Sequence, residues 1–122
     1  MLDFEDSPYE FFSPRLNRSV LRLAQEVNRW LALPLRHQVS SFVLQGEDRL
    51  DALRKQGARV VFVPNHSTHS DPHIMMEFLR RTKWVSQPMA AYDVFQRSAA
   101  TEWLMTRCGA FSIDRDGTDR AS

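Results

Sequence analysis

The stretch Ala58-Arg59-Val60-Val61-Phe62-Val63-Pro64-Asn65-His66-Ser67-Thr68-His69-Ser70-Asp71-Pro72 decides the expected fold. Its first part, residues 58–63, is nearly continuous in apolar and β-branched residues, which is typical of a central strand covered on both faces. Pro64 ends this strand. Asp71-Pro72 then opens a helix, because proline fits the first helical position. A buried strand that leads through a loop into a helix predicts an α/β domain.

Helix and strand patterns alternate along the rest of the chain. Apolar residues recur every three or four positions from Leu16 to Leu33, which predicts an amphipathic helix that stops near Pro34. Further helices are expected over 47–56, 72–83 and 99–108, and β-prone segments over 39–44, 84–91 and 110–113. We therefore predict a partial mixed sheet flanked by helices and preceded by an N-terminal arm and amphipathic helix, residues 1–35.

Composition excludes several classes of protein. With 122 residues, 43% of them hydrophobic and 25% charged, the chain is expected to form one folded unit. A formal net charge of +1 gives no field that would concentrate nucleic acid. Cys108 is the single cysteine, so no internal disulfide is expected. The acidic start and the lack of a long apolar run predict a cytoplasmic protein with at most peripheral membrane contact.

The loop between the predicted strand and helix carries the residues most suited to catalysis. His66 follows the strand directly, at the edge of the sheet where sites of open α/β folds usually lie. Transfer of an acyl group to an alcohol needs a base of near-neutral pKa and a carboxylate that fixes its tautomer. His66 and Asp71 are of these two types, and at five positions apart across a loop they could come within hydrogen-bonding reach.

Two short segments resemble signature blocks of one enzyme family. Asn65-His66, four residues and then Asp71 resemble the first block of the glycerol-3-phosphate and lysophosphatidic acid acyltransferases. Gly109-Ala110-Phe111-Ser112-Ile113-Asp114-Arg115 resembles their second block and follows at a matching separation. Two blocks in this order are more specific than either one alone. The resemblance covers residues 41–115 and implies that 36–122 is the N-terminal part of a glycerol-3-phosphate acyltransferase-like α/β domain.

The resemblance also implies an activity and roles for single residues. It implies an O-acyltransferase that moves a fatty acyl group from acyl-CoA or acyl carrier protein to a hydroxyl of a glycerol-phosphate or lysophospholipid-type acceptor. His66 would be the general base, Asp71 its orienting carboxylate and Arg115 a ligand of the acceptor's phosphate. Asn65 and Gly109 belong to the same blocks and are assigned to substrate binding. No metal, cofactor or covalent acyl-enzyme is implied, so Cys108 is not expected to be a nucleophile.

The family's third block, a Pro-Glu-Gly segment, does not occur in these 122 residues. The sequence is therefore expected to hold only part of the site. The alternative to an enzyme is a truncated, non-catalytic fragment that binds lipid or a partner.

Several residues also have plainer or different interpretations. Asp71 before Pro72 could act only as a helix cap, His66 could be an ordinary loop histidine, and Arg115 could be a solvated turn residue. His66, His69 and His73 could bind zinc together with Asp71, although His69 and His73 are expected to face solvent. The helix over 16–33 is expected to dock on the sheet. Its arginines and Trp30 would also suit contact with the inner face of the cell membrane, the less favoured of the two interpretations.

Overall fold

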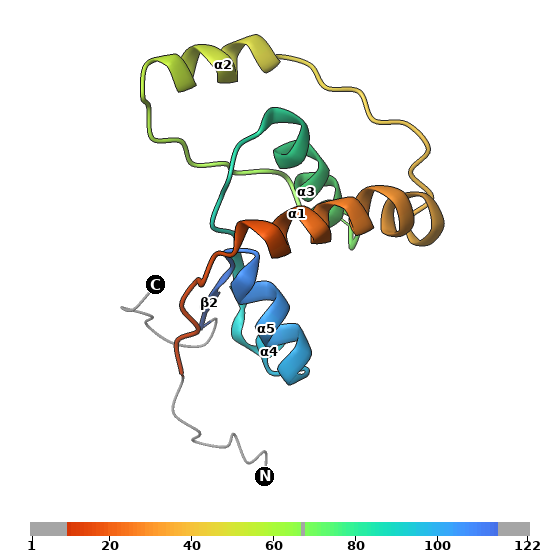
Figure 1. The fold of residues 1–122 in the computed structure, drawn as a ribbon, viewed down its shortest axis with the longest axis vertical. Coiled ribbons are helices and arrows are strands. Elements are labelled where there is room, and N and C mark those ends of the chain that lie inside the picture. Colours follow the sequence, from red (N-terminus) through yellow and green to blue (C-terminus); the bar gives the residue numbers. More distant parts are fainter. Residues whose placement is uncertain (1–9, 67, 115–122) are drawn as a thin grey trace. The chain divides into compact units, whose positions relative to one another are not determined.

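The computed structural model describes residues 10–66 and 68–114 (Figure 1). Its elements, in chain order, are α1 (Arg18–Val27), the π-helix η1 (Asn28–Arg36), α2 (Glu47–Lys55), α3 (Asp71–Thr82), β1 (Met89–Ala91), α4 (Tyr92–Phe95), α5 (Ala99–Arg107) and β2 (Phe111–Ile113). Leu23–Val85 forms one compact unit, and the described residues up to Arg22 and from Ser86 onward form another.

In the unit Leu23–Val85, α3 packs against η1. α3 begins as expected at Asp71 and Pro72. Its last turn carries two arginines, Arg80 and Arg81, whose positive charges suit the negative end of the helix dipole. Lys83 ends it in the left-handed conformation, with φ 59°. The helix predicted over 72–83 is confirmed, and it carries Asp71 in its first turn.

The helix predicted over 16–33 is also confirmed, but its predicted end near Pro34 is wrong. Pro34 lies inside η1, and the helix continues to Arg36. The His37 N–H donates to the carbonyl of Ala32, five residues earlier, at 3.0 Å. A π-type turn is wider than an α-turn, so the proline ring fits without the clash that ends an α-helix.

The apolar side of this helix is largely uncovered within its own unit. Leu23 is 67%, Trp30 62% and Leu35 73% exposed, whereas Leu33 is buried. The expected docking of this helix on a sheet is therefore not seen for these residues within the unit Leu23–Val85. The contact with α3 covers part of η1.

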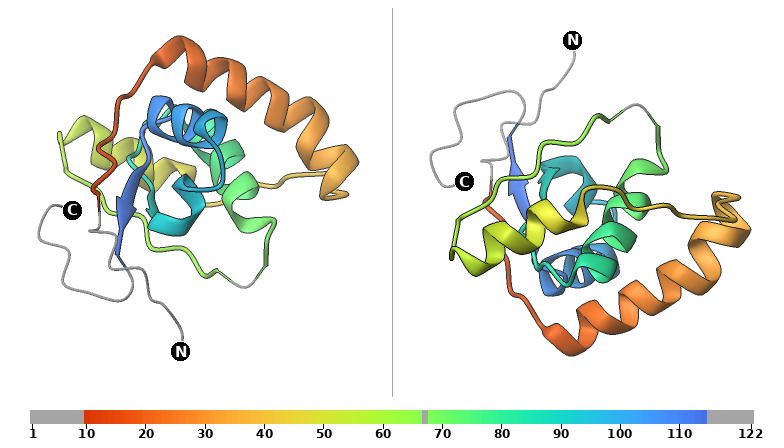
Figure 2. Two further views of the ribbon diagram at one scale, coloured as in Figure 1. Left: turned by 90° about the horizontal axis from the view of Figure 1, so that it is seen from below. Right: turned by 90° about the horizontal axis from the view of Figure 1, so that it is seen from above.

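The segments over 39–44 and 58–63 are extended but belong to no strand, so both strand predictions are wrong. Figures 1 and 2 draw the chain on either side of α2 as plain coil. Val61 and Val63 are 86% and 87% exposed, the reverse of a buried central strand. A central strand is buried only when neighbouring strands pair with it, and among residues 10–66 and 68–114 none pairs with 58–63.

One side of the segment 58–63 does contact the unit's interior. The ring of Phe62 meets the rings of Phe78 and Trp84 edge to face, with centroids 5.6 and 5.9 Å away. Such aromatic contacts fix the segment next to α3 without a hydrogen-bonded ladder. Successive side chains of this segment alternate between half-buried and exposed, as in a strand. Only the side that carries Phe62 is covered.

The other unit contains the sheet that the structure describes. β1 and β2 pair in parallel, with Ala90 opposite Ser112, while α4 contacts both strands and α5 (Figure 1). The helix over 99–108 and the strand over 110–113 are confirmed. The strand predicted over 84–91 is confirmed only for Met89–Ala91, after Pro88. The fold is thus α/β in a coarse sense, while the larger sheet is not seen in the described part of the chain.

The N-terminal arm completes the interior of this unit. Phe12 stacks on Phe95 with centroids 5.2 Å apart, and Phe95 is only 1% exposed. The Phe12 N–H donates to Ser112 Oγ at 2.8 Å, and the Ser112 N–H donates to the Phe12 carbonyl at 3.1 Å. The arm therefore lies beside β2, held by these two hydrogen bonds. The predicted division at residue 35 stays a prediction.

Candidate active site

His66 and Asp71 contact each other at the start of α3. His66 Nδ1 lies 3.2 Å from Asp71 Oδ2. The His66 side chain is 68% exposed and that of Asp71 24% exposed. The hydrogen bond that the five-residue spacing permits is therefore present. The imidazole ring is largely exposed, so a substrate could approach it.

Thr68 binds the same carboxylate from within the loop. Its N–H donates to Asp71 Oδ2 at 2.8 Å, and its hydroxyl donates to Asp71 Oδ1 at 3.1 Å. Thr68 was not among the residues that the sequence patterns singled out. A signal existed, because threonine three positions before an acidic residue and an apolar helix is a known local hydrogen-bonding pattern.

Ser70, rather than Asp71, occupies the N-cap position of α3. The Asp71 carboxylate turns back toward Thr68 and His66, which both precede the helix. Asp71 therefore does not act only as a helix cap, because its carboxylate contacts His66. Its position in the first helical turn also places negative charge near the positive end of the helix dipole.

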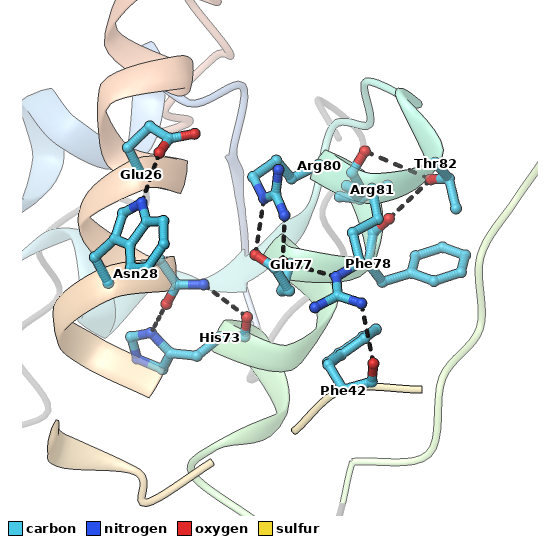
Figure 3. A network of polar contacts seen from close by, with 11 residues as sticks. Glu26, Asn28, Phe42, His73, Glu77, Phe78, Arg80, Arg81 and Thr82 are labelled. Atoms are coloured by element: carbon cyan, nitrogen blue, oxygen red, sulfur yellow. Dashed lines mark hydrogen bonds and ion pairs between the residues drawn. The ribbon is translucent and has the colours of Figure 1, made fainter. Parts of the chain in front are cut away.

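His73 does not join His66, and its predicted exposure to solvent is wrong. Its Nδ1 lies 2.7 Å from Asn28 Oδ1, and Asn28 Nδ2 donates to the His73 carbonyl at 2.9 Å (Figure 3). Burial lowers the pKa of His73, and the charges of His37 and Arg36 lower it further. A neutral His73 thus ties α3 to η1.

His69 is exposed, as expected. Among residues 10–66 and 68–114, no group of three or more His, Cys, Asp or Glu side chains is placed to bind a metal ion. The zinc site that would combine His66, His69 and His73 is not assembled, because His73 turns toward η1.

A buried acidic residue fixes the far half of α3. Glu77 is 1% exposed, and its carboxylate accepts hydrogen bonds from Arg80 Nε at 3.0 Å and Arg81 Nε at 2.9 Å (Figure 3). Burial alone would raise the pKa of Glu77, but the hydrogen bonds and charges of the two arginines lower it overall. Arg81 also donates to the carbonyl of Phe42 at 3.0 Å, which joins α3 to the segment over 39–44.

An open groove of about 470 Å³ runs beside Asp71 within the unit Leu23–Val85. Its walls are mostly apolar and come from three places: α3 and the two extended segments. They are formed by Phe42, Val43, Leu44, Gln45, Phe62, Val63, Pro64, Asn65, Asp71, Ile74, Met75 and Phe78. Apolar walls with one carboxylate at the rim suit a long hydrocarbon substrate whose reactive end is polar.

The other predicted site residues are placed differently. Asn65 is exposed and lines the groove. Gly109 belongs to the other unit, where its φ of 93° favours glycine and the Ser86 carbonyl oxygen would lie only 3.2 Å from any Cβ atom. Arg115 lies outside the described residues. Burial raises the pKa of the Cys108 thiol, which disfavours the thiolate that a nucleophile requires.

In the unit Leu23–Val85, a histidine and a carboxylate are thus in contact, and the carboxylate, Asp71, lines an apolar groove. A family model described as Acyltransferase matches residues 42–122, more than half of the chain. The chain therefore belongs to the acyltransferase family, which agrees with the resemblance of its two signature blocks to glycerolipid acyltransferases. No curated protein and no solved structure was found to match.

Membership of this family indicates acyl transfer as the general reaction. No helix among residues 10–66 and 68–114 is both long and apolar enough to cross a membrane.

Proposed function

We propose that the protein transfers a fatty acyl group from an acyl thioester, on coenzyme A or acyl carrier protein, to a hydroxyl of a glycerol-phosphate or lysophospholipid-type acceptor. The observation that carries this proposal is the 3.2 Å contact between His66 Nδ1 and Asp71 Oδ2. The His66 side chain is 68% exposed, so its other ring nitrogen, Nε2, is proposed to be within reach of a substrate hydroxyl.

In the proposed reaction His66 is the general base. Its Nε2 takes the proton of the acceptor hydroxyl while the hydroxyl oxygen attacks the carbonyl carbon of the thioester. Collapse of the tetrahedral intermediate breaks the carbon–sulfur bond, and the imidazolium returns the proton to the departing thiolate. Asp71 holds the proton on Nδ1 and stabilises the imidazolium, but stays ionised throughout.

The proposed substrate contacts follow from the lining of the groove and from the chemistry that binds phosphate. The apolar groove beside Asp71 suits the acyl chain. A guanidinium suits phosphate because it binds two oxygens and stays charged, so Arg115 is proposed to bind the acceptor's phosphate. Asn65, at the groove rim, and Gly109 are proposed as further substrate contacts.

The test compares the wild-type protein with His66→Ala. Release of free thiol from palmitoyl-CoA is followed in the presence of glycerol 3-phosphate or lysophosphatidic acid, and the acylated product is identified. We expect the variant to lose turnover. His69→Ala is the matched control, because His69 is an exposed histidine in the same loop. Retained turnover in His66→Ala would disprove the assignment.

A second candidate function, binding of lipid without catalysis, is favoured by the exposed apolar residues of η1 and the end of α1. Leu23, Trp30 and Leu35 are exposed, and three arginines, Arg22, Arg29 and Arg36, lie within the same run. Such a helix would bind the inner face of the cell membrane through its apolar and basic side chains. A wild-type protein that binds vesicles but turns over no thioester would favour this function over the first.

A further inference from the structure

Thr68 contacts both oxygens of the Asp71 carboxylate. Its N–H and its hydroxyl bind the two different oxygens of that carboxylate, at 2.8 and 3.1 Å. Two donors from one residue fix the plane of a carboxylate, which a single donor leaves free to rotate. The Asp71 N–H in turn donates to the Thr68 carbonyl at 3.3 Å.

The direction of the Thr68 hydroxyl proton is itself determined. The Ser70 N–H donates to Thr68 Oγ1 at 3.3 Å. A hydroxyl has one proton and two lone pairs, and this bond occupies a lone pair. An ionised carboxylate can only accept, so the Thr68 hydroxyl donates to Asp71 Oδ1, and the chain from Ser70 through Thr68 to Asp71 has a single donor direction.

The contact between His66 and Asp71 needs such support because burial does not enforce it. The His66 side chain is 68% exposed, so water competes for Nδ1 and the imidazole has room to rotate. A base that accepts a proton at Nε2 must carry its own proton on Nδ1. That tautomer is favoured only while Oδ2 stays turned toward the ring.

We infer that Thr68 is a positioning residue of this site, whose hydroxyl holds Asp71 so that Oδ2 accepts the Nδ1–H of His66 and Nε2 is left as the base. The inference rests on the proposed function, since a base at Nε2 matters only if His66 takes a proton from an acceptor hydroxyl. The hydroxyl acts through Asp71 and is assigned no contact with substrate.

The test compares Thr68→Val with Thr68→Ser. Valine has nearly the same shape as threonine but no hydroxyl, whereas serine keeps the hydroxyl. In protein labelled with ¹⁵N-histidine, the imidazole nitrogen shifts of neutral His66 report which nitrogen carries the proton. We expect the Nδ1–H form in wild type and Thr68→Ser, and a mixture of both forms in Thr68→Val. Turnover of Thr68→Val should fall by about tenfold in kcat, with KM unchanged, as expected for one hydrogen bond to a charged group.

Thr101→Val is the control, because it removes a hydroxyl from the N-terminus of α5, where Thr101 Oγ1 lies 2.8 Å from Ser98 Oγ. It should leave the His66 spectrum as in wild type. Thr68→Ala repeats the measurement if circular dichroism shows that the valine variant is unfolded. Wild-type nitrogen shifts in Thr68→Val, or the same loss in Thr68→Ser, would overturn the inference. The spectrum needs no turnover, so its outcome is separate from that of His66→Ala.

Discussion

The imidazole rings of His37 and His73 lie tilted by 36° with their centroids 4.2 Å apart, and this pair joins the end of η1 to the first turn of α3. His37 Nδ1 also lies 3.0 Å from Ser70 Oγ. Burial, with the charges of His37 and Arg36, lowers the pKa of His73, so this junction is expected to respond to pH.

Stability should fall as this junction is acidified. Burial, with the charges of His37 and Arg36, lowers the pKa of His73, so the unfolded chain binds this proton at higher pH than the folded chain. The contribution is fully present above about pH 6.5 and is lost as the pH falls through the lower, folded-state pKa. We expect a lower Tm at about pH 5 than at about pH 7.5, measured by circular dichroism.

His73→Gln should flatten this pH dependence, because it removes the titrating group while keeping a polar side chain near Asn28. His69→Gln, at an exposed position, should leave the wild-type dependence unchanged. If His73→Gln kept the same change in Tm between the two pH values, the assignment to His73 would be wrong.

Glu77→Gln should destabilise the fold more than any exposed substitution. It removes the charge of a side chain that is 1% exposed and leaves Arg80 and Arg81, at 22% and 35% exposure, without their ion-pair partner. A cost of about 3 kcal/mol is expected, at the low end for a broken buried pair because the arginines are partly solvated. Urea unfolding measures it. Glu47→Gln, in the first turn of α2, should cost no more than about 0.5 kcal/mol, and equal costs would contradict the role given to Glu77.

Asp71→Asn should reduce kcat by roughly three to four orders of magnitude, since an amide in this position stabilises the wrong imidazole tautomer. KM should change little, because Asp71 is not assigned to acyl-chain binding. Steady-state thioester turnover measures both constants. A loss confined to KM would instead assign Asp71 to substrate binding.

The exposed apolar residues of α1 and η1 predict binding to anionic membranes. Trp30→Glu should reduce flotation with phosphatidylglycerol-containing vesicles, because it removes an aromatic anchor that is 62% exposed and adds a repelled charge. Trp103→Glu is the control, a tryptophan of α5 that is 49% exposed. Equal flotation of the two variants would reject the contact through residues 16–33.

Local patterns predicted the parts of the structure that depend on local interactions. α3 follows from Asp71-Pro72 and the spacing of its apolar residues, and the contact of His66 with Asp71 spans only five residues. Thr68 could have been selected on the same grounds, since its bonds to Asp71 span three residues.

Parts that depend on distant partners could not be predicted in this way. The segment over 58–63 has the composition of a buried strand, but its burial depends on pairing that its own residues do not encode. The contact of His73 with Asn28 could not be read from the local sequence, because the two residues lie 45 positions apart. The prediction that His73 faces solvent therefore failed. The pairing of Phe12 with Ser112 spans 100 positions, and the four residues of α4 are too few for a periodic pattern.

The segment Val60-Val61-Phe62-Val63, in which Val61 and Val63 are exposed, has a consequence for handling the protein. An extended, β-branched run that pairs with no strand in the described part of the chain is a template for the same run of another molecule, which leads to aggregation. It is bounded by Arg59, whose charge opposes stacking of identical chains, and by Pro64, which cannot donate to a ladder. We expect these two residues to limit pairing between molecules. Replacing either one should therefore shorten the time for which concentrated solutions stay clear.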